Sequence, residues 1–313
     1  MLILDRRAVA DALPFDRLID ALHAAFRAES NAPERTHHEL EVPGGANATL
    51  LLMPAWRPGH ALGVKIATIF PDNARKELPS VNASYLLLDA RSGEPKAVLD
   101  GAELTLRRTA AASALASRHL SRPDATTLLM VGTGKLAPNL IDAHATVRDI
   151  REVLVWGRRS EVAASVCERF RDAPFAATAV DDLENAVARA DIISCATLAT
   201  RPLVKGEWLV PGQHLDLVGA YRRDMSEVDG KALARSRIYV DTRPGALAEA
   251  GEIVQALAAG IIGEHDIAGD LYELSRGTCH GRESADEITL FKSVGTALED
   301  LAAAELAMEA RQP

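Results

Sequence analysis

The sequence contains few cysteines, and the three present, Cys167, Cys195 and Cys279, have neither metal-site nor redox-motif spacing. An odd number of scattered thiols is typical of reduced, buried cysteines, so we expect a cytoplasmic protein. The adjacent pair His37 and His38 has no further ligand at helical spacing, so we expect no metal ion there.

Long apolar runs and an excess of positive charge are also lacking. No stretch approaches the ~20 apolar residues of a membrane span. The N-terminal segment is interrupted by Asp5, Arg6, Arg7 and Asp11, which is unlike a signal peptide. The formal net charge of −9 argues against a nucleic-acid or anionic-membrane partner, although a local basic pocket is compatible with it.

The clearest motif is a glycine turn that joins an apolar run, 128–131, to a helical pattern. In such a unit the first glycine allows the tight turn, the second lets backbone approach a pyrophosphate, and a third small residue lets helix and strand pack. Phosphates would lie on the N–H groups at the helix N-terminus. An ordinary strand–helix turn is the alternative. The residues predicted to bind a dinucleotide here are Gly132, Thr133, Gly134, Lys135, Leu136 and Ala137.

Strand and helix patterns alternate from residue 126 onward, which predicts a doubly wound parallel sheet of the Rossmann type. About six strands would form a complete dinucleotide domain. The expected strands are 126–131, 152–156, 175–179, 191–195, 213–218 and 236–241, and the expected helices are 135–147, 160–171, 181–190, 226–234 and 246–259.

The second of these strands lacks the terminal acidic residue that would bind the ribose 2′-hydroxyl of NAD. It is followed instead by Gly157, Arg158, Arg159 and Ser160. Guanidinium groups without a carboxylate suit a 2′-phosphate, so NADP(H) is the preferred cofactor and NAD(H) the alternative. In a simpler interpretation Ser160 only caps a helix and the arginines are solvated.

Residues 1–121 have a different pattern, typical of an α+β domain. We expect a helical segment over 1–30, a loop over 31–46, an antiparallel sheet that includes a hairpin around 89–94, and an Ala-rich helix over 104–120. A final helix is expected at 296–310. Because six strands already complete the Rossmann sheet, 122–289, we expect the tail, 290–313, to return to the first domain.

Three cations in the first domain are candidates for holding a substrate carboxylate: Arg35, Lys65 and Arg108. Lys65 lies within an apolar strand, where burial of an unpaired ammonium is costly, although it could also face solvent. Arg107 and Arg108 point about 100° apart on a helix, so only one is expected to face a site. A guanidinium with an ammonium suits an α-carboxylate.

Several stretches, taken together and in order, resemble the ornithine cyclodeaminase/mu-crystallin family along nearly the whole chain. They are residues 52–55, 63–65, 104–111, 132–137, 196–197, 208–214, 251–252 and 291–295. The resemblance implies a substrate and dimerisation domain built from both chain ends, a Rossmann domain between them, and a homodimer.

The same resemblance implies roles for individual residues. Arg35, Lys65 and Arg108 match the cations that hold the substrate carboxylate, and Ser80 matches a small hydroxyl residue that lines the site. Lys292, which we expect near the start of the last helix, is a candidate for the pocket floor.

The nicotinamide end of the cofactor is expected between two loops. Ala196 and Thr197 follow the fourth strand of the Rossmann domain, and Val218 and Gly219 follow the fifth. Ser293 is a further candidate, next to the pocket floor.

One position departs from the pattern of the family's cyclodeaminases. Those enzymes carry an Asp two residues after the glycine that matches Gly219, whereas this chain has Tyr221 there and Asp224 three residues further on. This form is more similar to the reductase branch, which includes mu-crystallin-type ketimine reductases and pyrroline-2-carboxylate reductases. Tyr221 is either a proton donor or a wall of the pocket.

The sequence therefore predicts an NADPH-dependent reductase of small cyclic imino acids, such as pyrroline- or piperideine-2-carboxylate. Its catalytic candidates are Lys65, Arg108 and Tyr221. One alternative is an ornithine cyclodeaminase that holds NAD, and a related one is an alanine-dehydrogenase-like enzyme that uses free ammonia. A third is a nucleotide-binding protein without turnover, as the mu-crystallin resemblance allows.

Overall fold

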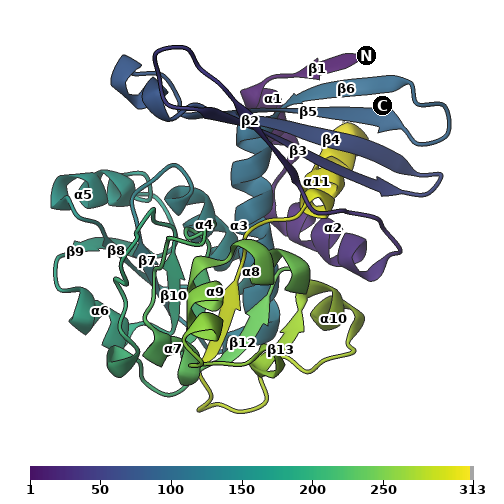
Figure 1. Ribbon diagram of the computed structural model, residues 1–313. Helices are drawn as coiled ribbons and strands as arrows, with labels where there is room; N and C mark the ends of the chain where they lie inside the picture. Colours follow the sequence, from purple (N-terminus) through teal and green to yellow (C-terminus); the bar gives the residue numbers. More distant parts are fainter. Residues whose placement is uncertain (311–313) are drawn as a thin grey trace. The chain divides into compact units, whose positions relative to one another are not determined.

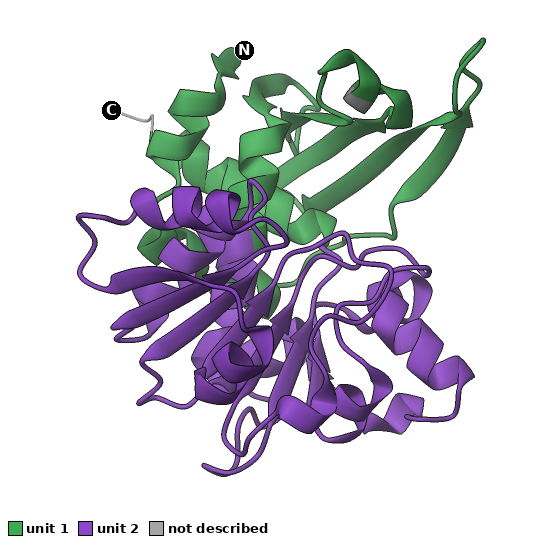
Figure 2. Ribbon diagram, turned by 90° about the vertical axis from the view of Figure 1, so that its left-hand side faces the viewer, with its two compact units in different colours: residues 1–109, 296–313 green, residues 110–295 purple. Residues whose placement is uncertain are grey.

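The computed structural model describes residues 1–310, apart from the side chain at position 74, and forms two compact units. Unit 1 contains residues 1–109 and the C-terminal segment from residue 296, and unit 2 contains residues 110–295 (Figure 2). The boundaries that we predicted, after residues 121 and 289, differ from this division. The shifts have two causes: one long helix spans the first boundary, and a late strand joins the sheet of unit 2.

Unit 1 is built on a six-stranded sheet in the order β1-β6-β5-β4-β3-β2. β1 runs parallel to β6 and the other neighbours are antiparallel, and β5 and β6 form the predicted hairpin. The expectation of a loop over 31–46 is wrong in part, because β2 pairs with β3 there; its polar, exposed sequence has no apolar alternation. The strands are β1 (Leu2–Leu4), β2 (Thr36–Leu40), β3 (Ala48–Arg57), β4 (Ala61–Ile69), β5 (Val81–Asp89) and β6 (Pro95–Asp100).

Helices cover one face of this sheet. α11 (Ala297–Glu309) packs against α2 (Phe15–Arg27) and against β3, β4 and β5 (Figure 1). Alternate residues of β4, including Gly63 and Lys65, are buried on this covered face. The alternative of a solvent-facing Lys65 is therefore wrong. Unit 1 also contains α1 (Arg6–Ala12) and the short helix η1 (Pro71–Lys76).

The opposite face of the sheet, which we call the outer face, is apolar. Its side chains alternate with those that face α11, and they are half-exposed or exposed, with Ile66 at 40% and Trp56 at 36%. Its apolar residues are Leu50, Leu52, Trp56, Leu62, Val64, Ile66, Leu86 and Leu88.

Unit 2 is built on an eight-stranded, fully parallel sheet in the order β13-β12-β14-β11-β10-β7-β8-β9. All six predicted strands are present, and the predicted α/β fold class is confirmed. The strands are β7 (Thr127–Val131), β8 (Glu152–Trp156), β9 (Ala176–Val180), β10 (Ile192–Cys195), β11 (His214–Leu217), β12 (Arg237–Val240), β13 (Ile267–Asp270) and β14 (Thr289–Lys292).

The position of β14 corrects the prediction for the tail. This strand pairs with β11 on one side and β12 on the other, so it lies in the middle of the sheet (yellow arrow in Figure 1). Lys292 and Ser293 therefore lie at the C-terminal end of a buried strand and not at the start of the last helix. Six strands do not complete the sheet, because the last strand in sequence lies between β12 and β11.

The helices of the second half of the chain are shorter than expected in two places. The helix predicted at 226–234 is only α7, and the one predicted at 246–259 is two helices that meet at Ala250. No helix within residues 1–310 has the length and apolar character needed to cross a membrane. The helices are α4 (Ala137–Val147), α5 (Ser160–Glu168), α6 (Leu183–Arg189), η2 (Gly206–Trp208), α7 (Gly230–Ala234), α8 (Arg243–Glu249), α9 (Gly251–Ala258), η3 (Glu264–Asp266) and α10 (Leu271–Arg276).

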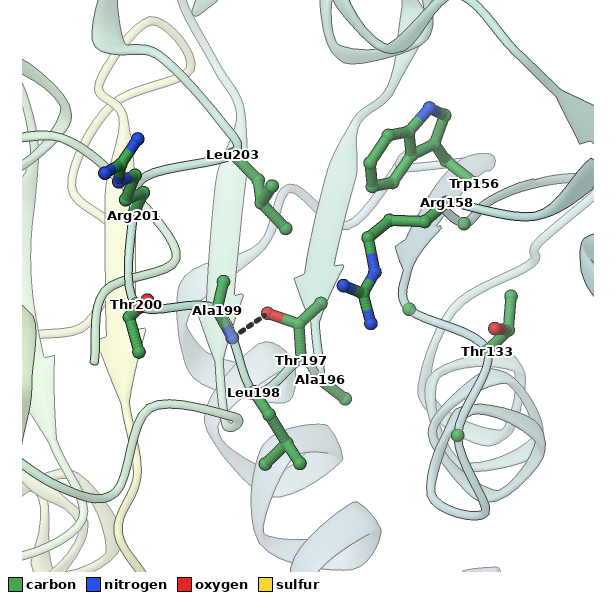
Figure 3. Close-up of a pocket in the computed structure, with 13 residues that line it drawn as sticks. Thr133, Trp156, Arg158, Ala196, Thr197, Leu198, Ala199, Thr200, Arg201 and Leu203 are labelled. Carbon is green, nitrogen blue, oxygen red and sulfur yellow. Dashed lines mark hydrogen bonds between the residues drawn. The ribbon is translucent and has the colours of Figure 1, made fainter. Parts of the chain in front are cut away.

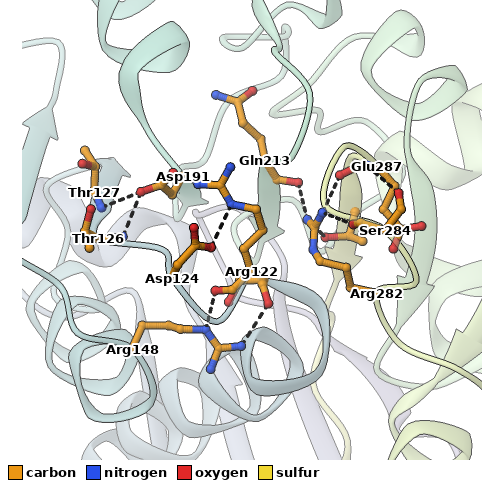
Figure 4. Close-up of polar contacts among 12 residues, drawn as sticks. Arg122, Asp124, Thr126, Thr127, Arg148, Asp191, Gln213, Arg282, Ser284 and Glu287 are labelled. Atoms are coloured by element: carbon orange, nitrogen blue, oxygen red, sulfur yellow. Dashed lines mark hydrogen bonds and ion pairs between the residues drawn. The ribbon is translucent and has the colours of Figure 1, made fainter.

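The long helix α3 (Gly101–Leu120) ends among arginines of unit 2. Arg148 donates hydrogen bonds to the carbonyls of Ser117 and Ser121 at 2.9 and 3.0 Å, and Arg282 donates to that of Leu120 at 2.7 Å. Figure 4 shows the same two guanidinium groups, with Arg148 donating to the carbonyl of Arg122 at 2.9 Å and Arg282 to that of Gln213 at 2.8 Å. The last carbonyls of a helix lack partners within it and carry partial negative charge, so guanidinium groups stabilise them. These contacts fix the second half of α3 in unit 2.

Candidate active site

The turn after β7 has the backbone that a dinucleotide site needs. Gly132 has φ +122°, and a Cβ there would lie 2.6 Å from the carbonyl oxygen of Ala196, so only glycine fits. At Gly134 a Cβ would meet nothing within 4 Å. The protein's own packing therefore does not require this second glycine, and its open side is where a pyrophosphate could approach the backbone. The turn and the first residues of α4 fit a dinucleotide.

A pocket of about 440 Å³ opens at this turn (Figure 3). Seven of the predicted cofactor residues line it: Gly132, Thr133, Gly134, Gly157, Arg158, Ala196 and Thr197. Six lining residues were not predicted: Trp156, Leu198, Ala199, Thr200, Arg201 and Leu203. Most of these belong to the loop after β10, whose sequence carries no motif beyond Ala196-Thr197.

Eight other predicted cofactor residues do not line this pocket. They are Lys135, Leu136, Ala137, Arg159, Ser160, Val218, Gly219 and Ser293. Ser293 donates a hydrogen bond to Asp241 at 3.1 Å, just after β14. Gly219 packs directly on the loop after β10, because a Cβ there would lie 2.1 Å from the carbonyl oxygen of Thr197.

The segment after β8 contains the predicted phosphate ligands. The guanidinium of Arg158 extends into the pocket (Figure 3). The hydroxyl of Ser160 lies 2.5 Å from Oδ1 of Asp181, to which it donates, and the indole of Trp156 donates to the carbonyl of Asp181 at 3.2 Å. Asp181 follows β9 and was not predicted. Its carboxylate accepts the hydrogen bond of the Ser160 hydroxyl, which we had expected near the 2′-phosphate.

Lys65 and Arg108 meet in unit 1 through two acidic residues of α11, and we call these four residues the cation cluster. The Lys65 ammonium lies 2.8 Å from Oδ2 of Asp300, and Nε of Arg108 donates to Oδ1 of Asp300 at 2.9 Å. Nη1 of Arg108 donates to Glu299 at 2.5 Å. All four side chains are buried. We did not predict the acids, although adjacent charges in an otherwise apolar helix are a usable signal, since buried charges need partners.

The electrostatics of the cation cluster make Lys65 unusually acidic. Burial, and then the positive charge of Arg108, lower the pKa of Lys65 to about 8, while Asp300 opposes this shift. The charge of Arg35 also acts on Lys65, in the same direction as Arg108. Arg107, by contrast, pairs with Glu103 at 3.2 Å, so of the two adjacent arginines only Arg108 belongs to the cluster.

A tyrosine that we did not predict lies beside the cation cluster. Tyr85 of β5 pairs in register with Lys65 of β4, and among the described residues its buried hydroxyl has no hydrogen-bond partner. Burial, and then Asp300, raise the pKa of Tyr85. A Cβ at Gly63 would lie 2.2 Å from this hydroxyl, so Gly63 makes room for Tyr85.

The two remaining substrate candidates, Ser80 and Lys292, belong to different units. Ser80 precedes β5 in unit 1, where its carbonyl accepts from Phe70 at 2.8 Å, and no hydrogen bond within residues 1–310 joins it to the cation cluster. In unit 2, Lys292 is fully buried and lies 3.2 Å from Glu252. Its role as a substrate ligand stays a prediction.

The loop after β11 carries Tyr221, which is partly buried against the core of unit 2. Asp224, the nearest acid to the position of the cyclodeaminase Asp, is exposed. It accepts two hydrogen bonds from Arg222, at 3.0 and 2.9 Å. Asp224 is therefore paired with Arg222 at the surface of unit 2.

Comparison with known proteins identifies the family. The sequence profile of the ornithine cyclodeaminase/mu-crystallin family matches residues 1–312. The chain belongs to this family. The resemblance inferred from the scattered motifs is thereby confirmed.

Similar proteins include enzymes of imino- and amino-acid metabolism. The Δ1-pyrroline-2-carboxylate reductase of Colwellia psychrerythraea is 39% identical over 314 residues, which cover 99% of each chain. The Thermococcus litoralis Δ1-pyrroline-2-carboxylate reductase, solved with NADH and L-proline, is 35% identical with a TM-score of 0.93, covering 99% of this chain and 97% of that one. An archaeal alanine dehydrogenase dimer with bound NAD is 32% identical with a TM-score of 0.91, covering 99% and 95%.

Proposed function

We propose that this protein is an NAD(P)H-dependent reductase of small cyclic imino acids, of the Δ1-pyrroline-2-carboxylate type. The observation that carries the proposal is the buried cation cluster, in a chain whose similar structure binds NADH and L-proline. L-proline is the product expected when the pyrroline ring is reduced, and the cation cluster supplies groups that recognise its carboxylate.

The two cations are oriented by the acids and keep donors for a ligand. An ammonium has three donors and a guanidinium has five. Arg108 uses Nε and Nη1 toward Asp300 and Glu299, so its Nη2 group is not taken up by these two acids. The ammonium of Lys65 gives one hydrogen bond to Asp300. Both cations could therefore bind a substrate carboxylate without releasing the acids that orient them, and Arg35 would add a third positive charge.

The reaction balances as a two-electron reduction. When bound, the reduced nicotinamide supplies a hydride to the imine carbon. The C=N π pair moves to the nitrogen, which enters as a protonated iminium, and the products are a cyclic secondary amino acid and the oxidised dinucleotide. Arg35, Lys65 and Arg108 contribute by fixing the carboxylate, and with it the ring carbon, so most of the catalysis is positioning. Because the nitrogen already carries its proton, the reduction itself needs no further donor. Tyr221 is either the residue that protonates a substrate arriving as the neutral imine or a wall of the pocket.

The NADP(H) preference belongs to the same proposal. Arg158 and Arg159 present guanidinium groups, and the strand before them ends in Trp156 and not in an acid. Asp181 opposes this preference, because its carboxylate lies beside Ser160 and would repel a 2′-phosphate bound there. We expect a lower Michaelis constant for NADPH than for NADH; a clear preference for NADH would contradict the assignment.

Two alternatives give different products. An ornithine cyclodeaminase would release ammonia from ornithine without net consumption of nucleotide, and the engagement of Asp224 by Arg222 argues against it. An amino-acid dehydrogenase using free ammonia is the second candidate, favoured by the similarity to an alanine dehydrogenase. A nucleotide-binding protein without turnover would show affinity only.

A substrate panel tests the proposal. We expect NADPH oxidation with pyrroline-2-carboxylate or piperideine-2-carboxylate, and far less with pyruvate plus ammonia or with ornithine and NAD. Lys65→Met should lose most of this activity while it still binds NADPH, and the exposed Lys96→Met in the same unit serves as the matched control. Equal turnover in Lys65→Met would refute the role of the cation cluster.

We also propose that the outer face of unit 1 binds a second copy of this chain. An exposed apolar patch marks a site of interaction, and the eight apolar residues of the outer face are all half-exposed or exposed. The similarity to an alanine dehydrogenase solved as a dimer supports a homodimer.

A further inference from the structure

A single buried carboxylate joins the two loops that we expect to flank the nicotinamide. Oε1 of Glu227 accepts hydrogen bonds from the N–H of Thr197 at 2.6 Å and from its hydroxyl at 2.8 Å. Oε2 accepts from the N–H groups of Gly219 and Ala220, at 2.7 and 3.3 Å. One side chain therefore satisfies four donors on loops that follow the adjacent strands β10 and β11.

These contacts favour an ionised side chain. Three of the four groups around the carboxylate of Glu227 are backbone N–H groups, which can only donate, and the fourth is the hydroxyl of Thr197, which donates as well. Burial raises the pKa of Glu227, which means that ionisation costs free energy here, whereas Lys292 and the hydrogen bonds of Thr197 offset part of this cost. Gly219 is also fixed by this arrangement, because a Cβ there would lie 2.4 Å from Oε1.

The surroundings of Glu227 carry an excess of negative charge. Glu252 accepts from the backbone N–H of Glu227 at 2.9 Å, and its other carboxylate oxygen lies 3.2 Å from the ammonium of Lys292. All three side chains are buried. Two carboxylates against one ammonium leave one negative charge directly behind Thr197, a residue that lines the pocket.

We propose that Glu227 is a positioning residue for the nicotinamide end of the dinucleotide, and that its charge favours the oxidised ring over the reduced one. The inference rests on the proposed function. Reduced nicotinamide is neutral and the oxidised ring is a cation, so a buried negative charge lowers the free energy of the state that follows hydride donation. Glu227 acts through Thr197 and Gly219, since it does not line the pocket itself.

The test compares affinities for the two redox forms. Glu227→Gln keeps the shape of the side chain but removes its charge. One carboxylate oxygen becomes an NH₂ group, which cannot accept hydrogen bonds from the donors that face it. Calorimetric titration of the purified full chain with NADPH and with NADP⁺ should show weaker binding of both. The ratio of the dissociation constant for NADP⁺ to that for NADPH should rise about tenfold, the order expected for one charge across roughly 1 nm at an effective dielectric constant of about 20. Glu264→Gln, exposed in the same unit, is the matched control and should leave the ratio unchanged.

A second variant keeps the inference testable if Glu227→Gln does not fold. Glu252→Gln removes one negative charge from the same buried group of three side chains while it leaves the four hydrogen bonds of Glu227 in place, so it should raise the same ratio. A purely structural role would lower both affinities and leave the ratio at the wild-type value, which would overturn the inference. If the wild type reduces the cyclic imine but its variants keep the ratio, only this inference fails. If the wild type binds neither form, the proposed function fails as well.

Discussion

At the residue scale, the ammonium of Lys65 makes substrate binding depend on pH. Its pKa is lowered to about 8, so the group loses its charge as the pH rises through that value. The inhibition constant of a simple ring carboxylate, such as cyclopentanecarboxylate, should be flat below pH 8 and rise above it. This inhibitor has no other group that titrates in the range, so the imine's own protonation does not enter the measurement.

Lys65→Arg provides the control for this pH dependence. A guanidinium keeps its charge to much higher pH. The inhibition constant of the variant should therefore stay flat up to about pH 10. An inhibition constant that stays flat from pH 7 to 9 in the wild type would contradict the role of the Lys65 ammonium.

At this scale the sequence indicates the cations but not their partners. Lys65 and Arg108 were predicted from their residue types and their setting, whereas Glu299 and Asp300 lie about 190 residues from Arg108 in sequence. Glu227 was missed for the same reason, because its four donors come from two separate loops and only the folded chain brings them together.

At the element scale, the two glycines of the β7–α4 turn should respond differently to alanine. Gly134→Ala meets no protein atom within 4 Å, so the melting temperature should stay the same or rise slightly, while NADPH affinity should fall at least tenfold because a methyl group blocks the approach of the pyrophosphate. Gly132→Ala would be strained at φ +122° and crowded against Ala196, and it should lower the melting temperature. Thermal unfolding and NADPH titration of both variants check this, and unchanged affinity in Gly134→Ala would contradict the site.

The strands and helices of unit 2 could be predicted because each βα unit repeats the same local sequence pattern. Apolar runs of four to six residues followed by helical periodicity gave all six expected strands. Neither β14 nor β13 could be placed, because their positions depend on pairing between distant segments. β2 was missed because an exposed edge strand needs no apolar face.

At the scale of the whole molecule, the outer face of unit 1 should hold two copies together. Ile66 is 40% exposed near its middle, so Ile66→Glu would place a charge in an apolar interface and should shift the protein from dimer to monomer in sedimentation at micromolar concentration. Ile261→Glu, at a similarly exposed position in unit 2, should leave the dimer intact. A wild type that sediments as a monomer would contradict the proposed interface.

The buried His214 should limit stability in acid. Nδ1 of His214 lies 3.0 Å from the hydroxyl of Thr289, which itself donates to Leu120, so His214 is the donor in its neutral form. Burial lowers the pKa of His214 to about 3. The unfolded chain binds this proton near pH 6.5 and the folded chain does not, so stability falls as the pH drops from about 6.5 toward 3, by roughly 1.4 kcal/mol per unit from this group.

His214→Asn checks this loss, since its amide can still donate to Thr289 but does not titrate. Urea unfolding at pH 7, 6 and 5 should show a shallower decline of the unfolding free energy in the variant than in the wild type. Parallel declines in the two proteins would assign the acid sensitivity to other groups.

The most direct test of the central claim is the stoichiometry of the reaction. Purified protein, NADPH and excess Δ1-pyrroline-2-carboxylate are incubated, and nucleotide oxidation and proline formation are followed together. A cyclic-imine reductase predicts one NADPH oxidised for each proline formed. Proline formed from ornithine with no net change in nucleotide, or no proline from the imine, would contradict the account.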